Sequence, residues 1–319
     1  MTSAAEVRSQ DLLLALAGPT AVGKSEVAIH LAQKLNGEII SVDSMQVYRG
    51  LDIGTAKPSP EQRARISHHL IDVVNLNSSF DAAQFRALAE SAVERIRQRG
   101  RIPILCGGTG LYFKVLFEGL GEAPGMDEKL RSELETTPLL ELLSELKDRD
   151  PATYKQIDRR NARRVVRAVE VIRLTRKPYS LQRAEWSQAS PRQHQHARIF
   201  GLRRSPADLA RRVDQRVEKM FEQGLVAETE SLLKAGLGEN RTALQALGYR
   251  QVLEYLRGLH SLAETIDLVK TRTRQFAKRQ MTWFRRQLLV NWIDVAPTDE
   301  AAHIADEVVK RLAEATMIK

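Results

Sequence analysis

One octapeptide constrains this chain more than any other feature, because it matches the pattern G-x-x-x-x-G-K-[ST]. Its residues are Gly18, Pro19, Thr20, Ala21, Val22, Gly23, Lys24 and Ser25. The apolar run 11–18 is typical of a buried strand, and apolar residues recur at helical spacing over 24–35. A phosphate-binding loop requires this strand–loop–helix context. The sequence therefore predicts an α/β fold that binds phosphate groups.

Each part of this loop has a chemical purpose. Glycines let backbone N–H groups converge on phosphate oxygens, and the helix N-terminus adds its positive end. Lys24 is expected to neutralise the terminal phosphates, and the Ser25 hydroxyl is expected to ligate Mg²⁺. Phosphate binding alone does not identify the reaction that the protein catalyses.

The remaining pattern predicts strands that alternate with helices around a long helical interruption. We expect strands at 38–43, 70–74, 101–106, 196–202 and 291–295, and helices at 81–100, from 205, at 261–289 and at 299–315. Residues 122–196 are predicted to be helical. The predicted fold is a P-loop NTPase-like parallel α/β core, residues 1–121 and 197–319, with a helical insertion domain at 122–196.

Composition narrows the class of protein. Of 319 residues, 43% are hydrophobic and 28% charged, which is typical of a globular protein. No apolar run approaches the roughly 20 residues of a membrane span, and the N-terminus lacks the order of a signal peptide. The single cysteine, Cys106, excludes a disulfide framework and a cysteine metal site. We therefore expect a cytoplasmic enzyme without membrane contact, and a monomer.

The net charge of +9 is concentrated in two segments. Residues 155–183 hold ten basic and two acidic residues, and residues 270–286 hold seven basic residues and no acid. The rest of the chain is therefore net negative. Such clustering is expected of a protein that binds a polyanion, although solvated helix faces would have the same composition.

Three further sites invite a chemical interpretation. Asp43 should follow a strand at the edge where α/β sheets place their ligands, where it could hold Mg²⁺, accept a proton or cap the next turn. The segment Gly107–Gly110 should reach the same edge, and Thr109 offers a hydroxyl there. Its glycines either permit the close approach of a ligand or only form the turn between a strand and a helix. Adjacent strand residues point to opposite faces, so His68 and His69 are not expected to share a metal.

Several of these blocks together resemble one family. The stretches are GPTAVGKS (18–25), DSMQVYRGLDIGTAKP (43–58), HHLID (68–72), GGTGLYFK (107–114), LGYRQ (247–251) and TRQFAKRQMTWFR (273–285). In this order, from about Leu12 to Ile293, they resemble the bacterial tRNA dimethylallyltransferases, also called tRNA isopentenyltransferases. The chain departs from the family's usual residues at Val22 and at Asn161-Ala162.

The resemblance implies a reaction and roles for the residues. A dimethylallyl group would pass from its diphosphate to N6 of the adenosine 3′-adjacent to the anticodon, releasing diphosphate, with Mg²⁺ required. The octapeptide at 18–25 would hold the diphosphate, and the catalytic residues Lys24 and Arg216 would bind it as a leaving group. Asp43 would take the proton from the amine, and Thr109 would line the channel beside the adenine.

The resemblance also implies contacts to the tRNA anticodon stem-loop. The positions are Asp43, Ser44, Met45, Gln46, Thr109, Arg131, Arg163, Arg164, Val165, Val166, Arg167, Ala246, Leu247, Gly248, Tyr249, Arg250, Gln251, Lys278, Arg279, Gln280, Met281, Thr282, Trp283, Phe284 and Arg285.

Two other functions fit part of the pattern. A small-molecule kinase would use the insertion as a lid over ATP, but a lid does not explain the segment 270–286, where Phe276, Trp283 and Phe284 interleave with cations. An RNA-binding ATPase would usually have an acidic residue after an apolar strand, whereas the strand ending at Cys106 leads into glycines. Whether ATP itself binds the loop is open.

Overall fold

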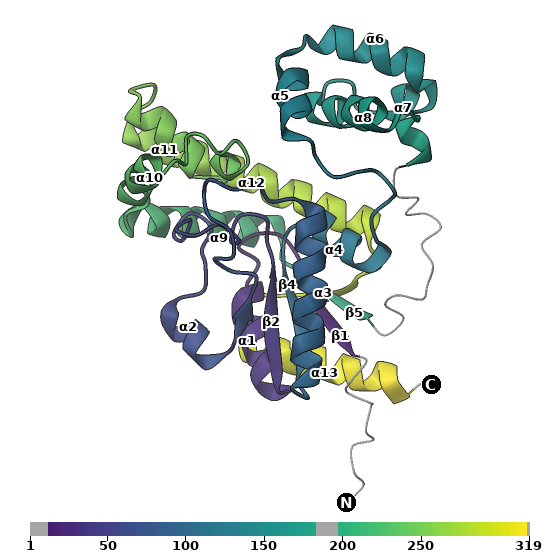
Figure 1. The fold of residues 1–319 in the computed structure, drawn as a ribbon. Helices are drawn as coiled ribbons and strands as arrows, with labels where there is room; N and C mark the ends of the chain where they lie inside the picture. The colour runs from purple at the N-terminus through teal and green to yellow at the C-terminus, as the bar shows by residue number, and fades with distance from the viewer. Residues whose placement is uncertain (1–11, 183–196, 318–319) are drawn as a thin grey trace, which may run out of the picture. The chain divides into compact units, whose positions relative to one another are not determined.

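The structure is a computed structural model that describes residues 12–182 and 197–317. The chain divides into two compact units (Figure 1). The core unit comprises Met1–Leu116 and His194–Lys319, and the insertion unit comprises Phe117–Gln193. The sequence analysis places the insertion at 122–196. Each unit is described by itself below.

The described part of the core unit contains a six-stranded sheet in the order β3-β2-β4-β1-β5-β6, and every pairing is parallel. The strands are β1 (Leu13–Ala17), β2 (Gly37–Val42), β3 (His68–His69), β4 (Ile102–Gly107), β5 (Ala197–Arg203) and β6 (Asn291–Asp294). Gly107 pairs with both Ala17 and Val42, so the chain leaves β1, β2 and β4 at one edge of the sheet. The predicted parallel α/β fold is confirmed.

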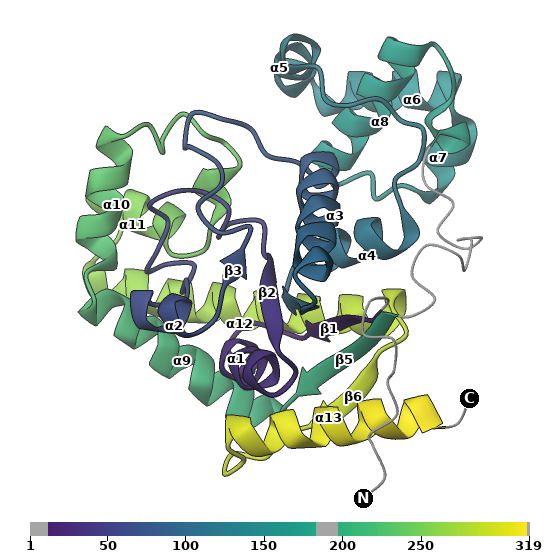
Figure 2. The ribbon, with the colours of Figure 1, turned by 60° about the horizontal axis from the view of Figure 1, so that its bottom comes forward.

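Helices cover both faces of this sheet (Figure 2). Those of the core unit are α1 (Lys24–Lys34), α2 (Pro60–Arg65), α3 (Ala82–Gln98), α4 (Gly110–Glu118), α9 (Pro206–Glu222), α10 (Leu225–Lys234), η2 (Ala243–Gln245), α11 (Tyr249–Leu256), α12 (Leu262–Gln287) and α13 (Ala301–Met317). Helices α1 and α13 pack together on one face, and α3 lies on the other. Apolar side chains such as Leu16, Ile29 and Phe200 fill the space beneath α1.

Local capping explains where several predicted helices begin. The Asp81 carboxylate accepts hydrogen bonds from the N–H groups of Ala83 and Gln84 at the start of α3. Ser205 caps α9 ahead of Pro206, and Ser261 forms a capping box at the start of α12. A side-chain acceptor satisfies N–H groups that the first helical turn leaves without a partner. These helix starts agree with the sequence prediction.

The strand predicted at 70–74 is wrong. Leu70 and Asp72 have φ angles of 62° and 57°, a left-handed conformation that a strand does not allow. The third strand is instead His68–His69, whose residues pair with Ile39 and Ile40 of β2.

The insertion unit is helical, as predicted. Its elements are α5 (Glu128–Thr136), α6 (Leu139–Arg149), α7 (Pro151–Gln156), α8 (Ala162–Thr175) and η1 (Tyr179–Leu181). Leu134, Leu146 and Val169 belong to its own hydrophobic core. Residues 183–196 of the predicted insertion lie outside the described residues. Among the described residues of both units, no helix is long and apolar enough to cross a membrane.

Candidate active site

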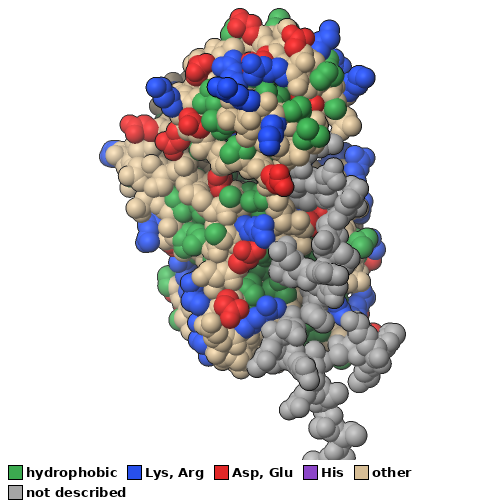
Figure 3. Space-filling model, turned by 45° about the vertical axis from the view of Figure 1, so that its right-hand side comes forward, with side chains coloured by type: hydrophobic (Ala, Val, Ile, Leu, Met, Phe, Trp, Pro, Cys, Tyr) green, Lys and Arg blue, Asp and Glu red, His purple; other side chains and the backbone are tan. Residues whose placement is uncertain are grey.

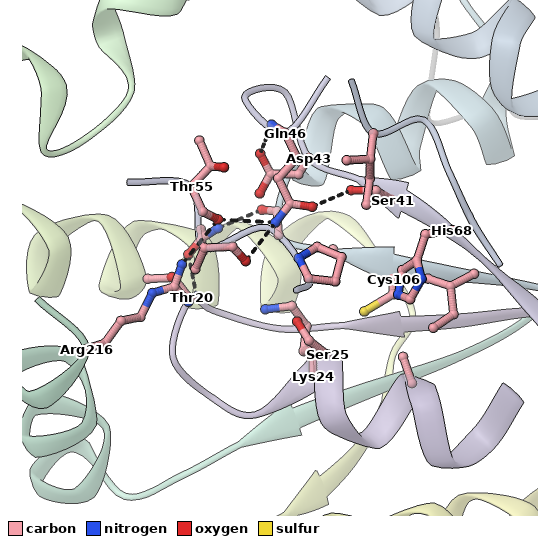
Figure 4. Close-up of a pocket in the computed structure, with 18 of the residues that line it drawn as sticks. Thr20, Lys24, Ser25, Ser41, Asp43, Gln46, Thr55, His68, Cys106 and Arg216 are labelled. Atoms are coloured by element: carbon pink, nitrogen blue, oxygen red, sulfur yellow. Dashed lines mark hydrogen bonds between the residues drawn. The ribbon is translucent and has the colours of Figure 1, made fainter. Parts of the chain in front are cut away.

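A cavity begins at the sheet edge where β1, β2 and β4 end, and it runs along one face of β2 (Figure 4). Alternate residues of this strand, Ile39 and Ser41, line it together with Asp43, because side chains on a strand point to one face every second residue. Helix α1 contributes Lys24 and Ser25. Further lining residues come from distant parts of the chain, among them His68, Gly108 and Gln280.

The phosphate-binding loop has the backbone that its glycines allow. Gly18 has a φ of 148°, and a Cβ there would lie 2.8 Å from the carbonyl oxygen of Leu202. Gly23 has a φ of 108° at the start of α1. A side chain at either position would be strained or would collide with the neighbouring strand. The Nζ of Lys24 donates a hydrogen bond to the Pro19 carbonyl at 2.7 Å, so its ammonium group already points into the loop.

Two cations meet in the cavity wall. The pKa of Lys24 is lowered to about 8, mainly by burial and also by the charge of Arg216, against the opposing effects of Cys106 and Asp43. Burial also lowers the pKa of Arg216, against the opposing effect of Asp43. Within the described ranges neither cation forms an ion pair; Arg216 donates only to the Thr55 carbonyl, at 3.5 Å. Cations held this way favour an anionic ligand.

Asp43 has one oxygen engaged by the backbone. Its Oδ1 accepts hydrogen bonds from the N–H groups of Met45 at 2.8 Å and Gln46 at 3.3 Å. Asp43 therefore caps the next turn through Oδ1, which is one of the three roles considered for it. Because the caps fix Oδ1, they also fix the direction of Oδ2, and Figure 4 shows Asp43 on the cavity wall beyond Lys24 and Ser25. Capping and a role in chemistry are compatible in one carboxylate.

Thr109 joins the loop after β4 to the loop after β2. Its Oγ1 accepts a hydrogen bond from the Ser44 N–H at 3.1 Å, and its own N–H donates to the Val42 carbonyl at 3.2 Å. The two loops that carry Asp43 and Thr109 are thus held as one. The structure brings together Lys24, Ser25, Asp43 and Arg216 in the lining of the cavity. Thr109 is not among these lining residues, but it is hydrogen-bonded to Ser44, the residue after Asp43.

The glycines of the Gly107–Gly110 loop are required by protein neighbours. A Cβ on Gly107 would lie 2.0 Å from the Val42 carbonyl oxygen. A Cβ on Gly108 would meet Gln280, and one on Gly110 would meet the Trp283 ring at 2.1 Å. The close approach expected here is therefore made by α12 and β2, while Gly107 and Gly108 also line the cavity.

Two arginines that the sequence did not single out bind backbone carbonyls of the phosphate-binding loop. Arg204 donates to the Val22 carbonyl at 3.0 Å, and Arg212 donates to the Ala21 carbonyl at 2.9 Å. Arg204 is itself paired with buried Asp208. These arginines thereby fix two carbonyl groups of the loop. Arg204 lies just before α9 and Arg212 lies within it, and nothing in their local sequence links them to the phosphate-binding loop.

Known proteins resemble this chain over most of its length. The family model for IPP transferase matches residues 46–287. A tRNA dimethylallyltransferase 2 of Geotalea uraniireducens is 44% identical over 88% of this chain and 92% of its own length. A tRNA dimethylallyltransferase of Pelotomaculum thermopropionicum is 41% identical over 93% of this chain and 95% of its own.

The chain belongs to the IPP transferase family. The crystal structure of a tRNA isopentenylpyrophosphate transferase from Bacillus halodurans is similar, with a TM-score of 0.68 and 38% identity over 97% of this chain and 99% of that one. A eukaryotic dimethylallyltransferase acting on tRNA superposes with a TM-score of 0.78 at 28% identity, over 94% of this chain and 80% of that one. The resemblance drawn from the six sequence blocks is confirmed.

Among the positions that the family resemblance links to tRNA, three groups differ in exposure and pairing, while others such as Met281 and Trp283 are half-buried. Side chains in the first group are exposed, and in α12 they include Lys278, Arg279, Thr282 and Arg285. Arg163 and Arg164 of α8 are exposed as well. Figure 3 shows basic and acidic side chains side by side on one face of the molecule.

In the second group, side chains are paired internally. Arg131 and Arg167 of the insertion unit donate to the fully buried carboxylate of Glu170, at 3.0 and 2.7 Å. Glu170 also accepts a hydrogen bond from the Asp127 N–H. These arginines neutralise a buried charge, which is a structural role whatever else they contact.

Side chains of the third group are buried, so they cannot contact RNA in this structure. Val165 and Val166 lie in the core of the insertion unit, and Phe284 and Tyr249 are fully buried in the core unit. The Tyr249 hydroxyl donates to Glu228 at 2.6 Å and accepts from the Gly54 N–H at 3.1 Å. Tyr249 therefore links two of the family's sequence blocks, 43–58 and 247–251, and holds the loop that carries Thr55.

Proposed function

We propose that this protein transfers a dimethylallyl group from dimethylallyl diphosphate to N6 of the adenosine 3′-adjacent to the anticodon of tRNA. One observation carries the proposal: the lining of a single cavity includes both a charged set and an apolar set of side chains. Lys24, Arg216 and Asp43 belong to the charged set, and Ile39 and Ile71 belong to the apolar set. This division suits a diphosphate with a short hydrocarbon chain.

The chemistry follows from these groups. The adenine N6 forms a bond to the allylic carbon while the C–O bond to the diphosphate breaks, and the bonding electrons leave with the diphosphate. Lys24 and Arg216 stabilise the growing negative charge on that leaving group. Asp43 accepts the proton that N6 loses, because an exocyclic amine is a poor nucleophile unless a base removes this proton.

We extend the proposal to Mg²⁺ as a cofactor. The Ser25 hydroxyl lines the cavity at the start of α1, where a hydroxyl oxygen suits this hard cation. Among the described residues, no group of three or more His, Cys, Asp or Glu side chains converges to hold a metal. A cation at Ser25 would therefore draw its other ligands from diphosphate oxygens and water, and it would supply positive charge to the leaving group.

The tRNA side of the proposal rests on α12. Its exposed residues Lys278, Arg279 and Arg285 make no ion pair with any described residue, so they are available to phosphates. The inner side of the same helix reaches the cavity through Gln280. A target base in an anticodon loop can leave its stack at small cost and enter such a cavity.

A transfer assay tests this function against a kinase. The protein is incubated with ¹⁴C-labelled dimethylallyl diphosphate and undermodified tRNA, and in parallel with γ-³²P-labelled ATP and the same tRNA. We expect ¹⁴C in the tRNA and release of diphosphate. Transfer of ³²P to an acceptor, or phosphate release from ATP without ¹⁴C transfer, would support a kinase or an ATPase instead.

A further inference from the structure

Helix α12 has an exposed basic side and an inner side that contacts the loops of Thr20 and Gly108. Lys278, Arg279 and Thr282 are exposed, whereas Gln280 is only 8% exposed. Gln280 thus lies among residues that face solvent, yet its own side chain is directed into the protein. A buried amide needs partners for its oxygen and its NH₂ group, since leaving them unpaired costs free energy.

Gln280 uses both ends of its amide on two different loops. Its Oε1 accepts a hydrogen bond from the Thr20 N–H at 2.9 Å, and its Nε2 donates to the Gly108 carbonyl at 2.9 Å. The partners lie 260 and 172 residues away in the sequence. A backbone N–H can only donate and a carbonyl can only accept, so only a side chain with both functions satisfies this pair.

The two loops serve opposite ends of the reaction. Thr20 belongs to the phosphate-binding loop. Gly108 precedes Thr109, which accepts the hydrogen bond from Ser44 beside Asp43. One side chain therefore joins the phosphate-binding loop to the loop that is bonded to Ser44, beyond the strand pairing that ends at Gly107. Gly108 has no Cβ that could keep Gln280 out, since a Cβ there would lie 2.3 Å from Nε2.

We infer that Gln280 is a positioning residue: it sets the phosphate-binding loop against the loop of Thr109 and Asp43, and it links both to the helix that carries the exposed cations. The inference rests on the proposed function and changes the role expected for Gln280, which acts on the two loops rather than as an RNA contact. A displacement of about 1 Å between reacting groups can cost roughly 10²-fold in rate. Removing the bridge should accordingly slow the chemical step more than it weakens binding.

The test compares Gln280→Met, which keeps the approximate shape without hydrogen bonds, with Gln98→Met on the exposed end of α3. Both are measured for single-turnover transfer at saturating tRNA and dimethylallyl diphosphate, and for the dissociation constant of each substrate. We expect Gln280→Met to lower the single-turnover rate by about 10–100-fold, with both dissociation constants within about threefold of wild type. Gln98→Met should match wild type in all three.

A second variant keeps the inference falsifiable if Gln280→Met does not fold. Gln280→Glu retains the acceptor for Thr20 but loses the donor to Gly108, and protonation of the new carboxyl group restores that donor. The ratio of its single-turnover rate to that of wild type should therefore rise as the pH is lowered from 8 to 6. An unchanged single-turnover rate, a weakened tRNA affinity with normal rate at saturation, or a pH-independent ratio would overturn the inference. Absence of transfer by the wild-type protein would instead refute the proposed function.

Discussion

Strand β2 carries a carboxylate near each end, and the two have different surroundings. Near its start, the Glu38 side chain is 3% exposed and binds Arg99 at 2.7 Å, Arg101 at 3.1 Å and His69 at 2.6 Å. Just after its end, Asp43 has no ion pair within the described structure, and only backbone N–H groups bind its Oδ1. The first carboxylate is neutralised by the protein, and the second faces a cavity with two cations.

The difference shows what separates a structural charge from a reactive one. Strand alternation directs Glu38 and Asp43 to opposite faces of the sheet, yet both lie near cations. At Glu38, hydrogen bonds from Arg99 and His69 outweigh burial and lower its pKa. At the cavity, Lys24 and Arg216 keep their charge without an acid partner, which costs stability until an anion binds. We therefore expect changes near Glu38 to affect folding and changes at the cavity to affect transfer.

The largest effect is expected at Asp43. Asp43→Asn keeps the shape and the capping oxygen but cannot accept the amine proton, so the transfer rate should fall about 10²–10⁴-fold. Binding of dimethylallyl diphosphate, measured by calorimetry, should remain near normal. If Asp43 is chiefly a Mg²⁺ ligand, diphosphate binding and metal dependence should fall together instead. A rate within about threefold of wild type would refute both roles.

Glu38→Gln should show the opposite pattern. Loss of the buried carboxylate leaves Arg99 and Arg101 with a weaker partner, and we expect a loss of about 3 kcal/mol in the free energy of unfolding. This is the upper end for hydrogen bonds to a charged group, because several are weakened together, while both arginines are almost half exposed and remain hydrated. Denaturant unfolding checks the loss, and the transfer rate of the folded variant should be near normal. A stable variant with slow transfer would contradict the comparison.

The same carboxylate predicts a pH dependence. The folded-state pKa of Glu38 lies below its ordinary value of 4.5, so its contribution to stability is present above that pH and is lost as the pH falls through the lowered pKa. The stability difference between wild type and Glu38→Gln should therefore shrink as the pH falls below 4.5. A difference that stays constant down to pH 3 would show that the ion pairs do not cause it.

A substitution at Lys24 tests the role of the cations in the cavity. Lys24→Ala should weaken diphosphate binding and slow transfer, with a combined loss of about 2–4 kcal/mol in transition-state stabilisation. Its unfolding free energy should not decrease much, because the pKa of Lys24 is lowered in the folded state and its charge contributes no ion pair. Steady-state kinetics and thermal unfolding provide the two measurements. Near-normal transfer would refute the phosphate-binding assignment.

The smallest effects are expected at the basic surface. Replacing Lys278, Arg279 or Arg285 with alanine should reduce the slope of log tRNA affinity against log salt concentration by about 0.7–0.9 for each residue. The affinity for dimethylallyl diphosphate should not change. Alanine at Arg167 should lower stability as well, because it leaves buried Glu170 with one partner fewer. A tRNA affinity that does not respond to salt would show that the cations of α12 are only solvated.

Local signals made much of the fold predictable. The strand–loop–helix around 18–25 and the caps at Asp81, Ser205 and Ser261 depend on neighbouring residues alone. The third strand did not follow from local pattern, because the pairing of His68 and His69 with β2 decides its position.

The site was predictable only in part. Its motif residues are contiguous in the sequence, whereas the contacts that fix them are distant. Gln280 reaches Thr20, Tyr249 reaches Gly54, and Arg212 reaches Ala21, and no periodicity links such pairs. The burial of Val165 and Phe284 likewise depends on tertiary packing, so a match to a tRNA-contacting segment does not say which of its side chains are accessible.

The most direct test of the account maps the product atom. A tRNA transcript with adenosine 3′-adjacent to the anticodon is incubated with wild-type protein, Mg²⁺ and dimethylallyl diphosphate, digested to nucleosides and analysed by mass spectrometry with fragmentation. We predict one dimethylallyl group on N6 of that adenosine, and none in a transcript with guanosine at the same position. Modification at another nucleoside, or an unmodified tRNA from folded protein with both substrates bound, would contradict it.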